Sequence, residues 1–226
     1  PRMSAEVPEP QQQQPPEQPG SQQGFSLAEL TASFNRCRAQ PGLGLAAYAD
    51  GYDQLLHFLR SLNKAFYFVV QDVDSKLRIL RSHIVGPEAA SFSSIAGMLQ
   101  FESAGGFAGK ENGSRTLLRL HRALLFLVLL LDRLVSAPAD KSISSIAGES
   151  YNESLANHHP WAVRKAVGLA LYLLPSRETL LANMAQQNAC DAAGVRQLVT
   201  EAVPCLKDVY DQTQRLYSEA KALELP

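Results

Sequence analysis

One stretch, residues 114–134, constrains the fold more than any other part of the sequence. Its residues, SRTLLRLHRALLFLVLLLDRL, have the apolar spacing of a long helix. At about 100° per residue, Arg115, Arg119 and Arg122 fall within an arc of roughly 60° on one face. Apolar residues follow farther along that face, and the opposite face is apolar throughout. A helix with this pattern has to be buried on more than one side.

The three arginines need a counterpart, because burying unpaired guanidinium groups beside an apolar run is costly. One interpretation is a ligand with an anionic head and an apolar tail. The alternative is a charged stripe in contact with solvent at the end of a core helix. Taken alone, this stretch favours the second interpretation.

The rest of the chain is also predicted to be helical. Apolar residues at helical spacing predict further helices near residues 26–40, 45–60, 64–85, 88–101, 142–157, 161–174, 177–187 and 192–223. No segment shows the sustained alternation that is typical of strands. Residues 1–24 hold six of the thirteen prolines and a cluster of glutamines, which predicts a disordered tail. We therefore expect one all-α domain of about eight helices over residues 25–226.

Composition and spacing argue against several classes of function. The formal net charge of −1 gives no field over the whole surface that would attract nucleic acid. The longest uncharged apolar run, 123–131, is far shorter than the roughly 20 residues that span a bilayer. Three widely spaced cysteines form no disulfide or zinc pattern, which fits a reducing compartment. His121, His158 and His159 have neither metal-binding spacing nor a nucleophile beside them, so we expect no metal site and no catalytic site.

A second pair of charges lies on the helix predicted over 64–85. Asp72 and Lys76 are four residues apart and share a helix face, with Phe68 and Val69 one turn before them. By itself the pair would be a surface salt bridge that contributes little to stability. Packed against residues 114–134, however, it would form a polar mouth above an apolar slot. Trp161 is predicted to be either a core residue or an anchor at a membrane surface.

Four separated blocks carry a family resemblance. They are DVDSKLRIL (72–80), SRTLLRLHRAL (114–124), SYNESLANHHPW (150–161) and QRLYSEAKALELP (214–226). Their order and spacing resemble the glycolipid transfer protein family over residues 24–226. The resemblance implies a two-layer helical sandwich that encloses an apolar lipid pocket for one sphingolipid. It also implies that the protein uses no cofactor and performs no covalent chemistry.

The resemblance implies roles for individual residues. Asp72 resembles the aspartate that recognises the ceramide amide, and His159 resembles its partner, which donates to the ceramide carbonyl. Lys76 and Arg119 stand where the glycolipid-binding branch has Asn and a Trp platform for the sugar. Together with Arg115, they resemble the branch that carries ceramide-1-phosphate. Lys and Arg donors in a poorly solvated site bind a phosphate monoester well, whereas a neutral sugar binds better to an aromatic ring on which it can stack.

Other residues receive supporting roles from the same resemblance. Arg122 is expected to support the headgroup site. The expected pocket-lining residues are Phe58, Phe66, Phe68 and Val69. The residues expected to contact the membrane during uptake and release are Trp161, Arg78 and Arg81.

The sequence thus predicts a non-enzymatic carrier that moves ceramide-1-phosphate between membranes. We expect a cytosolic monomer that contacts membranes transiently and binds no nucleic acid. One alternative is a sensor or adaptor that binds the same lipid but acts through a protein partner. Another is a helical interaction module that binds no lipid. An enzyme comes last, because no nucleophile–base set is present.

Overall fold

The computed structural model describes residues 24–62, 64–109 and 112–226. The predicted tail therefore lies outside the described residues, apart from Gly24. Within them the chain forms nine α-helices and two short 3₁₀ turns, and no strand. The α-helices are α1 (Leu27–Ala39), α2 (Leu45–Leu62), α3 (Tyr67–Ile84), α4 (Ile95–Ala104), α5 (Gly113–Ser136), α6 (Ile143–Ser154), α7 (Trp161–Tyr172), α8 (Arg177–Gln187) and α9 (Ala192–Glu219).

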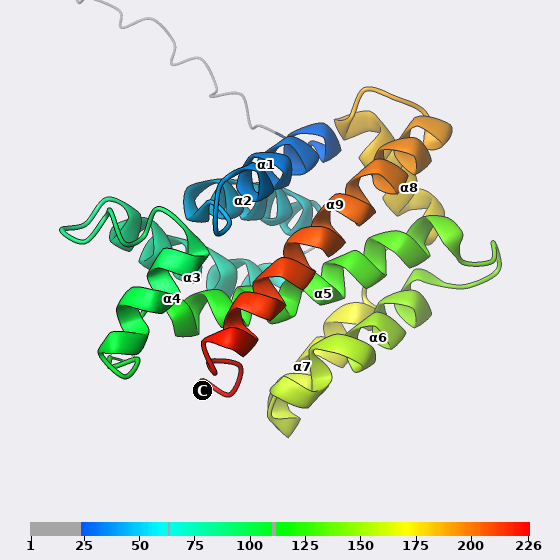
Figure 1. Cartoon of the computed structure of the whole chain (residues 1–226). Helices are drawn as coiled ribbons and strands as arrows, with labels where there is room; N and C mark the ends of the chain where they lie inside the picture. Colours follow the sequence, from blue (N-terminus) through cyan, green and yellow to red (C-terminus); the bar gives the residue numbers. More distant parts are fainter. Residues whose placement is uncertain (1–23, 63, 110–111) are drawn as a thin grey trace, which may run out of the picture.

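The helices form the expected two-layer sandwich (Figure 1). In one layer α1, α2 and α3 pack successively against one another, and in the other α9, α5 and α6 do the same. The layers meet where α1 lies on α9 and α3 lies on α5. The remaining helices pack at the edges, with α4 on α5 and α9, α7 on α6, and α8 on α9. Helix α5 packs against helices of both layers and against α4, as its nearly all-round apolar pattern predicted.

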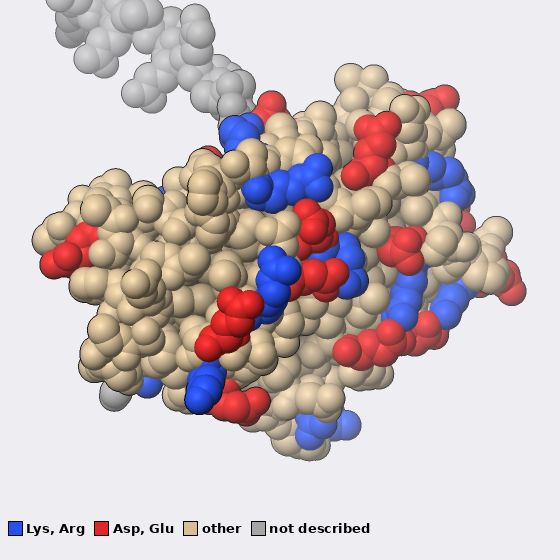
Figure 2. Space-filling view, viewed as in Figure 1, with Lys and Arg blue, Asp and Glu red and all other residues tan. Residues whose placement is uncertain are grey.

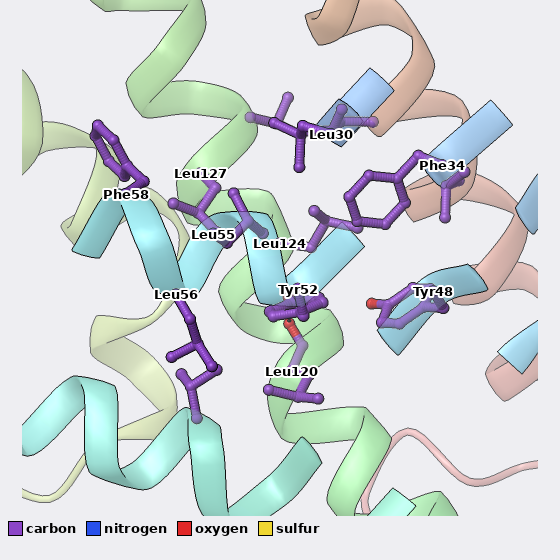
Figure 3. Packing of buried hydrophobic residues seen from close by; sticks show 14 of the residues in the cluster. Leu30, Phe34, Tyr48, Tyr52, Leu55, Leu56, Phe58, Leu120, Leu124 and Leu127 are labelled. Atoms are coloured by element: carbon purple, nitrogen blue, oxygen red, sulfur yellow. Dashed lines mark hydrogen bonds between the residues drawn. The ribbon is translucent and has the colours of Figure 1, made fainter. Parts of the chain in front are cut away.

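Side chains from both layers fill the space around α5. Leu120 and Leu124 of α5 are buried, as the predicted apolar face requires. They lie against Tyr52, Leu55 and other apolar residues of α2 (Figure 3). The hydroxyl of Tyr52 donates to the carbonyl of Leu120 and so satisfies a polar group inside the core. Each fully buried leucine of this kind stabilises the fold by roughly 1.5–3 kcal/mol.

Capping residues decide where the helices begin. The Ser26 hydroxyl accepts a hydrogen bond from the backbone N of Glu29, at 3.2 Å, and starts α1 as expected. Helix α4 begins at Ile95 and not near residue 88, because Ser94 caps it through the backbone N of Gly97. Residues 86–92 form short turns instead, with bonds between residues three apart.

His121 is a core residue of α5. Its Nε2 lies 2.7 Å from Oε1 of Gln214, and its ring stacks on Tyr210 with centroids 4.4 Å apart. Burial lowers the pKa of His121 to about 4, while Gln214 opposes the shift. The histidine is therefore neutral in the folded protein at neutral pH.

This histidine predicts a loss of stability in acid. Between about pH 6.5 and 4 the unfolded chain protonates His121 while the folded chain does not, so stability is full above this range and falls as pH drops. The slope is at most about 1.4 kcal/mol per pH unit. Urea unfolding across this range measures it, and His121→Asn should flatten the curve. Parallel curves for the two proteins would contradict the assignment.

On the face seen in Figure 2, Lys and Arg alternate with Asp and Glu along α9. No large area of this face therefore carries only positive or only negative charge. The region around α4 on that face is almost uncharged. Any electrostatic attraction of a ligand is therefore local. Among the described residues, no helix is both long enough and apolar enough to cross a bilayer.

Candidate functional site

The first part of the site is the charged pair on α3. Lys76 Nζ donates to Oδ1 of Asp72 one turn earlier, as their spacing predicted. The lysine side chain is only 12% exposed, whereas that of Asp72 is 65% exposed. An ion pair with one exposed partner contributes little to stability, so its partners can be exchanged at small cost.

His159 lies beside this pair, in the junction between α6 and α7. Its Nδ1 is 2.8 Å from the hydroxyl of Tyr151 on α6. Burial lowers the pKa of His159, the charge of Asp72 opposes this, and the charges of His158 and Lys76 add to it. The junction and the α3 pair are therefore close enough to interact. With the Tyr151 hydroxyl donating to Nδ1, the neutral ring carries its proton on Nε2 and can donate it to a ligand.

Arg115 lies in the first turn of α5 and is held by the loop before it. Asn112 Oδ1 accepts from the backbone N of Arg115 at 2.8 Å, and Arg115 Nη1 donates to the carbonyl of Gly109 at 2.7 Å. The Nε of Arg115 is buried and has no hydrogen-bond partner within the described part of the chain. A buried guanidinium N–H without a hydrogen-bond acceptor lowers the stability of the fold.

The N-terminus of α5 is itself occupied by a carboxylate. The two oxygens of Glu102 accept from the backbone N atoms of Gly113 and Ser114, each at 2.7 Å. The free N–H groups and positive dipole end of a helix usually attract anions. Because Glu102 already takes these donors, an anion near α5 has to bind through the arginine side chains.

Arg119 and Arg122 continue the row along α5 and contact residues near the end of α9. Arg119 Nη2 donates to the carbonyl of Pro226 at 3.3 Å, and Arg122 Nη2 donates to the carbonyl of Leu223 at 2.8 Å. Burial lowers the pKa of Arg122, with Glu224 opposing the shift and Arg119 adding to it. Figure 1 shows the C-terminal end beside the first half of α5.

His158 lies in the junction between α6 and α7 and interacts with one of the arginines of α5. Burial and the charge of Arg122 lower the pKa of His158, while Glu224 opposes the shift. The adjacent His159 interacts with Asp72 and Lys76, so the α6–α7 junction lies near both Arg122 of α5 and the charged pair of α3.

The expected pocket-lining residues lie in different environments. Phe58 and Phe66 are buried in the core, and Val69 is partly buried. Phe68 is 43% exposed at the start of α3. A hollow of about 1220 Å³ lies between the end of α3 and α4, and another of about 410 Å³ lies between α1 and α2. Neither hollow is lined by these four residues.

The residues expected to contact membranes are also separated. Trp161 is 66% exposed at the start of α7, and the same helix exposes Leu169 and Tyr172. Such an apolar patch on a surface indicates an interaction site. On α3, Arg78 pairs with Asp74 at 3.0 Å, and Arg81 is held by two carboxylates of α2.

Several residues of the site have weak sequence signals. Asn112 stands three residues before Arg115, which is the spacing of an N-cap and was available in the sequence. The contact between Tyr151 and His159 joins residues eight apart across a helix end, where helical periodicity does not apply. Arg119 and Arg122 donate to backbone carbonyl groups, and the sequence of side chains does not indicate such acceptors.

Comparisons with known proteins all indicate one family. The family model for glycolipid transfer protein matches residues 43–186. A ceramide-1-phosphate transfer protein from Danio rerio is 41% identical over 210 residues, which cover 89% of this chain and 98% of the relative.

Two crystal structures are also similar. The human ceramide-1-phosphate transfer protein in complex with 12:0 ceramide-1-phosphate has a TM-score of 0.84 at 37% identity, over 90% of this chain and all of the other. The apo-form of the mouse protein has a TM-score of 0.83 at 35% identity, over 89% of this chain and all of the other. The matched family region includes both the α3 pair and the α5 arginines. With the same helical sandwich around them, the chain belongs to the glycolipid transfer protein family, whose members transfer lipids and are not enzymes.

Proposed function

We propose that this protein binds ceramide-1-phosphate and moves it between membranes. The observation that carries the proposal is the buried Nε of Arg115, which has no hydrogen-bond partner among the described residues. A phosphate monoester carries up to two negative charges and several strong acceptor oxygens, which suit such donors. The names of the similar proteins and the lipid in the human complex support the same ligand.

In this proposal the phosphate is held by Lys76, Arg115 and Arg119. Lys76 exchanges its bond to Asp72 for a bond to the phosphate, which is a stronger interaction in a poorly solvated site. Asp72 then accepts from the amide N–H of the ceramide. His159 donates from Nε2 to the ceramide carbonyl, with Tyr151 fixing its ring.

The hydrocarbon chains belong between the two layers. Phe58 lies near the end of α2, and Phe66, Phe68 and Val69 lie just before and at the start of α3. We propose that the chains enter by displacing these residues. Each methylene that leaves water contributes about 0.8 kcal/mol, which offsets the cost of repacking.

We assign membrane contact to the apolar patch of α7, comprising Trp161, Leu169 and Tyr172. Indole favours the boundary between water and lipid. The charge of Arg81 is already balanced by two carboxylates, so this residue and Arg78 are secondary in the assignment. The protein would then be a cytosolic monomer that contacts membranes only during uptake and release.

Trp161→Ala is expected to slow transfer between vesicles by roughly 5- to 10-fold, since a loss of about 1–1.4 kcal/mol of membrane affinity corresponds to that factor. Equilibrium binding of a short-chain, water-soluble ceramide-1-phosphate should not change. Phe101→Ala is the matched control, because this aromatic residue is also exposed but lies on α4. An equal effect of both substitutions would argue against the α7 patch.

The proposed function is tested by transfer between donor and acceptor vesicles. Fluorescent ceramide-1-phosphate should move rapidly and fluorescent galactosylceramide should move little. Rapid movement of galactosylceramide without ceramide-1-phosphate would overturn the choice of ligand. Tight binding of ceramide-1-phosphate with negligible transfer would favour the sensor or adaptor.

A further inference from the structure

The segment 220–226 folds back from the end of α9 onto the arginines of α5. Lys221 adopts a positive φ of 53°, and the backbone N of Ala222 donates to the carbonyl of Tyr217 at 2.9 Å. The turn reverses the chain direction after α9. Ala222 is fully buried, and Leu223 and Leu225 pack against the core. The segment is therefore a packed part of the sandwich and lies against Arg119 and Arg122.

Arg122 fastens this segment. Its guanidinium donates to the carbonyl of Leu223 at 2.8 Å, and the carboxylate of Glu224 is close enough to affect its pKa. A partly buried guanidinium that is already bonded to a backbone carbonyl has fewer donors left for a ligand. Arg122 thus acts on the headgroup through the segment that it positions.

Arg119 joins the segment to the proposed phosphate site. One of its five N–H groups meets the carbonyl of Pro226, and the others remain available to the phosphate. The backbone at Pro226 and the phosphate would therefore share one guanidinium. Any group attached to the phosphate would have to pass this part of the chain.

A phosphate monoester and a phosphodiester differ in charge and in shape. Near neutral pH the monoester approaches a charge of −2 and the diester carries −1. Only the diester has a second group on its phosphate, and that group would meet the backbone at Pro226, whose carbonyl is bonded to Arg119.

We propose that the segment 220–226, fastened by Arg122, is a wall of the headgroup site that selects a phosphate monoester over a phosphodiester headgroup. This inference rests on the proposed function. Specificity of this kind comes from an element that obstructs the wrong ligand, in addition to contacts that favour the right one. Sphingomyelin, which has the same ceramide but a phosphocholine headgroup, is the ligand that the wall would exclude.

The experiment measures the ratio of vesicle transfer rates for ceramide-1-phosphate and sphingomyelin in the full chain, in Arg122→Leu and in a variant that lacks residues 223–226. The ratio should fall about tenfold or more in both variants. A tenfold change requires only a small difference between the free energies with which the protein binds the two lipids. Arg122→Lys, which can still donate to the Leu223 carbonyl, should keep the ratio within about threefold of the full chain. Equilibrium binding of short-chain forms of both lipids accompanies the rates.

The outcomes separate this inference from the proposed function. If the altered variants still move ceramide-1-phosphate and keep the original ratio of rates, the segment 220–226 does not select the headgroup. The inference is then wrong, and the proposed function stands. If both variants lose binding of ceramide-1-phosphate altogether, the segment is required for binding and not for selection, which also overturns the inference. If the full chain neither binds nor moves ceramide-1-phosphate, the proposed function itself fails.

Discussion

Arg115→Leu is expected to slow ceramide-1-phosphate transfer about 100-fold, which corresponds to about 3 kcal/mol of lost interaction between a buried charge and its partner. The reason is that Arg115 supplies the buried Nε that has no partner within the described part of the chain. Leucine fills a similar space along α5 but offers no donor to the phosphate. Lys76 and Arg119 alone would leave one side of the phosphate unsatisfied.

Vesicle transfer measures this effect, with circular dichroism to verify that helicity is unchanged. Arg38→Leu is the matched control, because Arg38 pairs with Asp208 on the surface between α1 and α9 at 3.3 Å. Its substitution should leave transfer within about twofold of the unaltered chain, as expected for a solvent-exposed ion pair. Normal transfer by Arg115→Leu would show that the phosphate is bound elsewhere.

Arg177→Met is expected to destabilise the fold by about 3 kcal/mol, or about 6–12 °C in Tm for a chain of this size. Arg177 is buried at the start of α8 and caps the far end of α5. Its Nε and Nη2 donate to the carbonyl of Leu134 at 3.0 and 2.7 Å. It also donates to the carbonyls of Ala137 at 3.0 Å and Pro138 at 2.6 Å.

These bonds satisfy carbonyl groups that a helix end leaves without partners. Methionine preserves much of the volume but leaves the buried acceptors unpaired, which is the costly case. Thermal unfolding measures the change. Arg196→Met is the matched control, since Arg196 also donates to a carbonyl in the last turn of α5, that of Val135 at 2.7 Å, but is exposed to solvent. Equal shifts of Tm for both variants would argue against burial as the cause.

The sequence could predict which residues form the candidate site, but not which contacts they make. Asp72 and Lys76 share a face because four residues make about one turn, and the arginines of α5 share a face for the same reason. The resemblance then supplied roles for these residues and for His159. Which neighbours each residue meets, such as Tyr151 or the carbonyl of Gly109, depends on packing between segments.

Arg122 illustrates this difference. By its position on the helix face alone it cannot be distinguished from Arg115 or Arg119, and only the family resemblance gave it a supporting role. In the structure it meets the carbonyl of Leu223, 101 residues farther along the chain. No periodic pattern encodes such a contact, because the acceptor is a backbone group whose position is set by the turn after α9.

The sequence by itself determined the helices, the central position of α5 and the grouping of charges on two helix faces. These properties follow from spacing within a few turns, which is local and survives without knowledge of the partners. Only the tertiary structure decided that α4 starts at Ser94, that Arg177 caps α5, and that the segment 220–226 lies against the arginines. These features join residues distant in sequence, and their positions follow from how the two layers bury their apolar faces together.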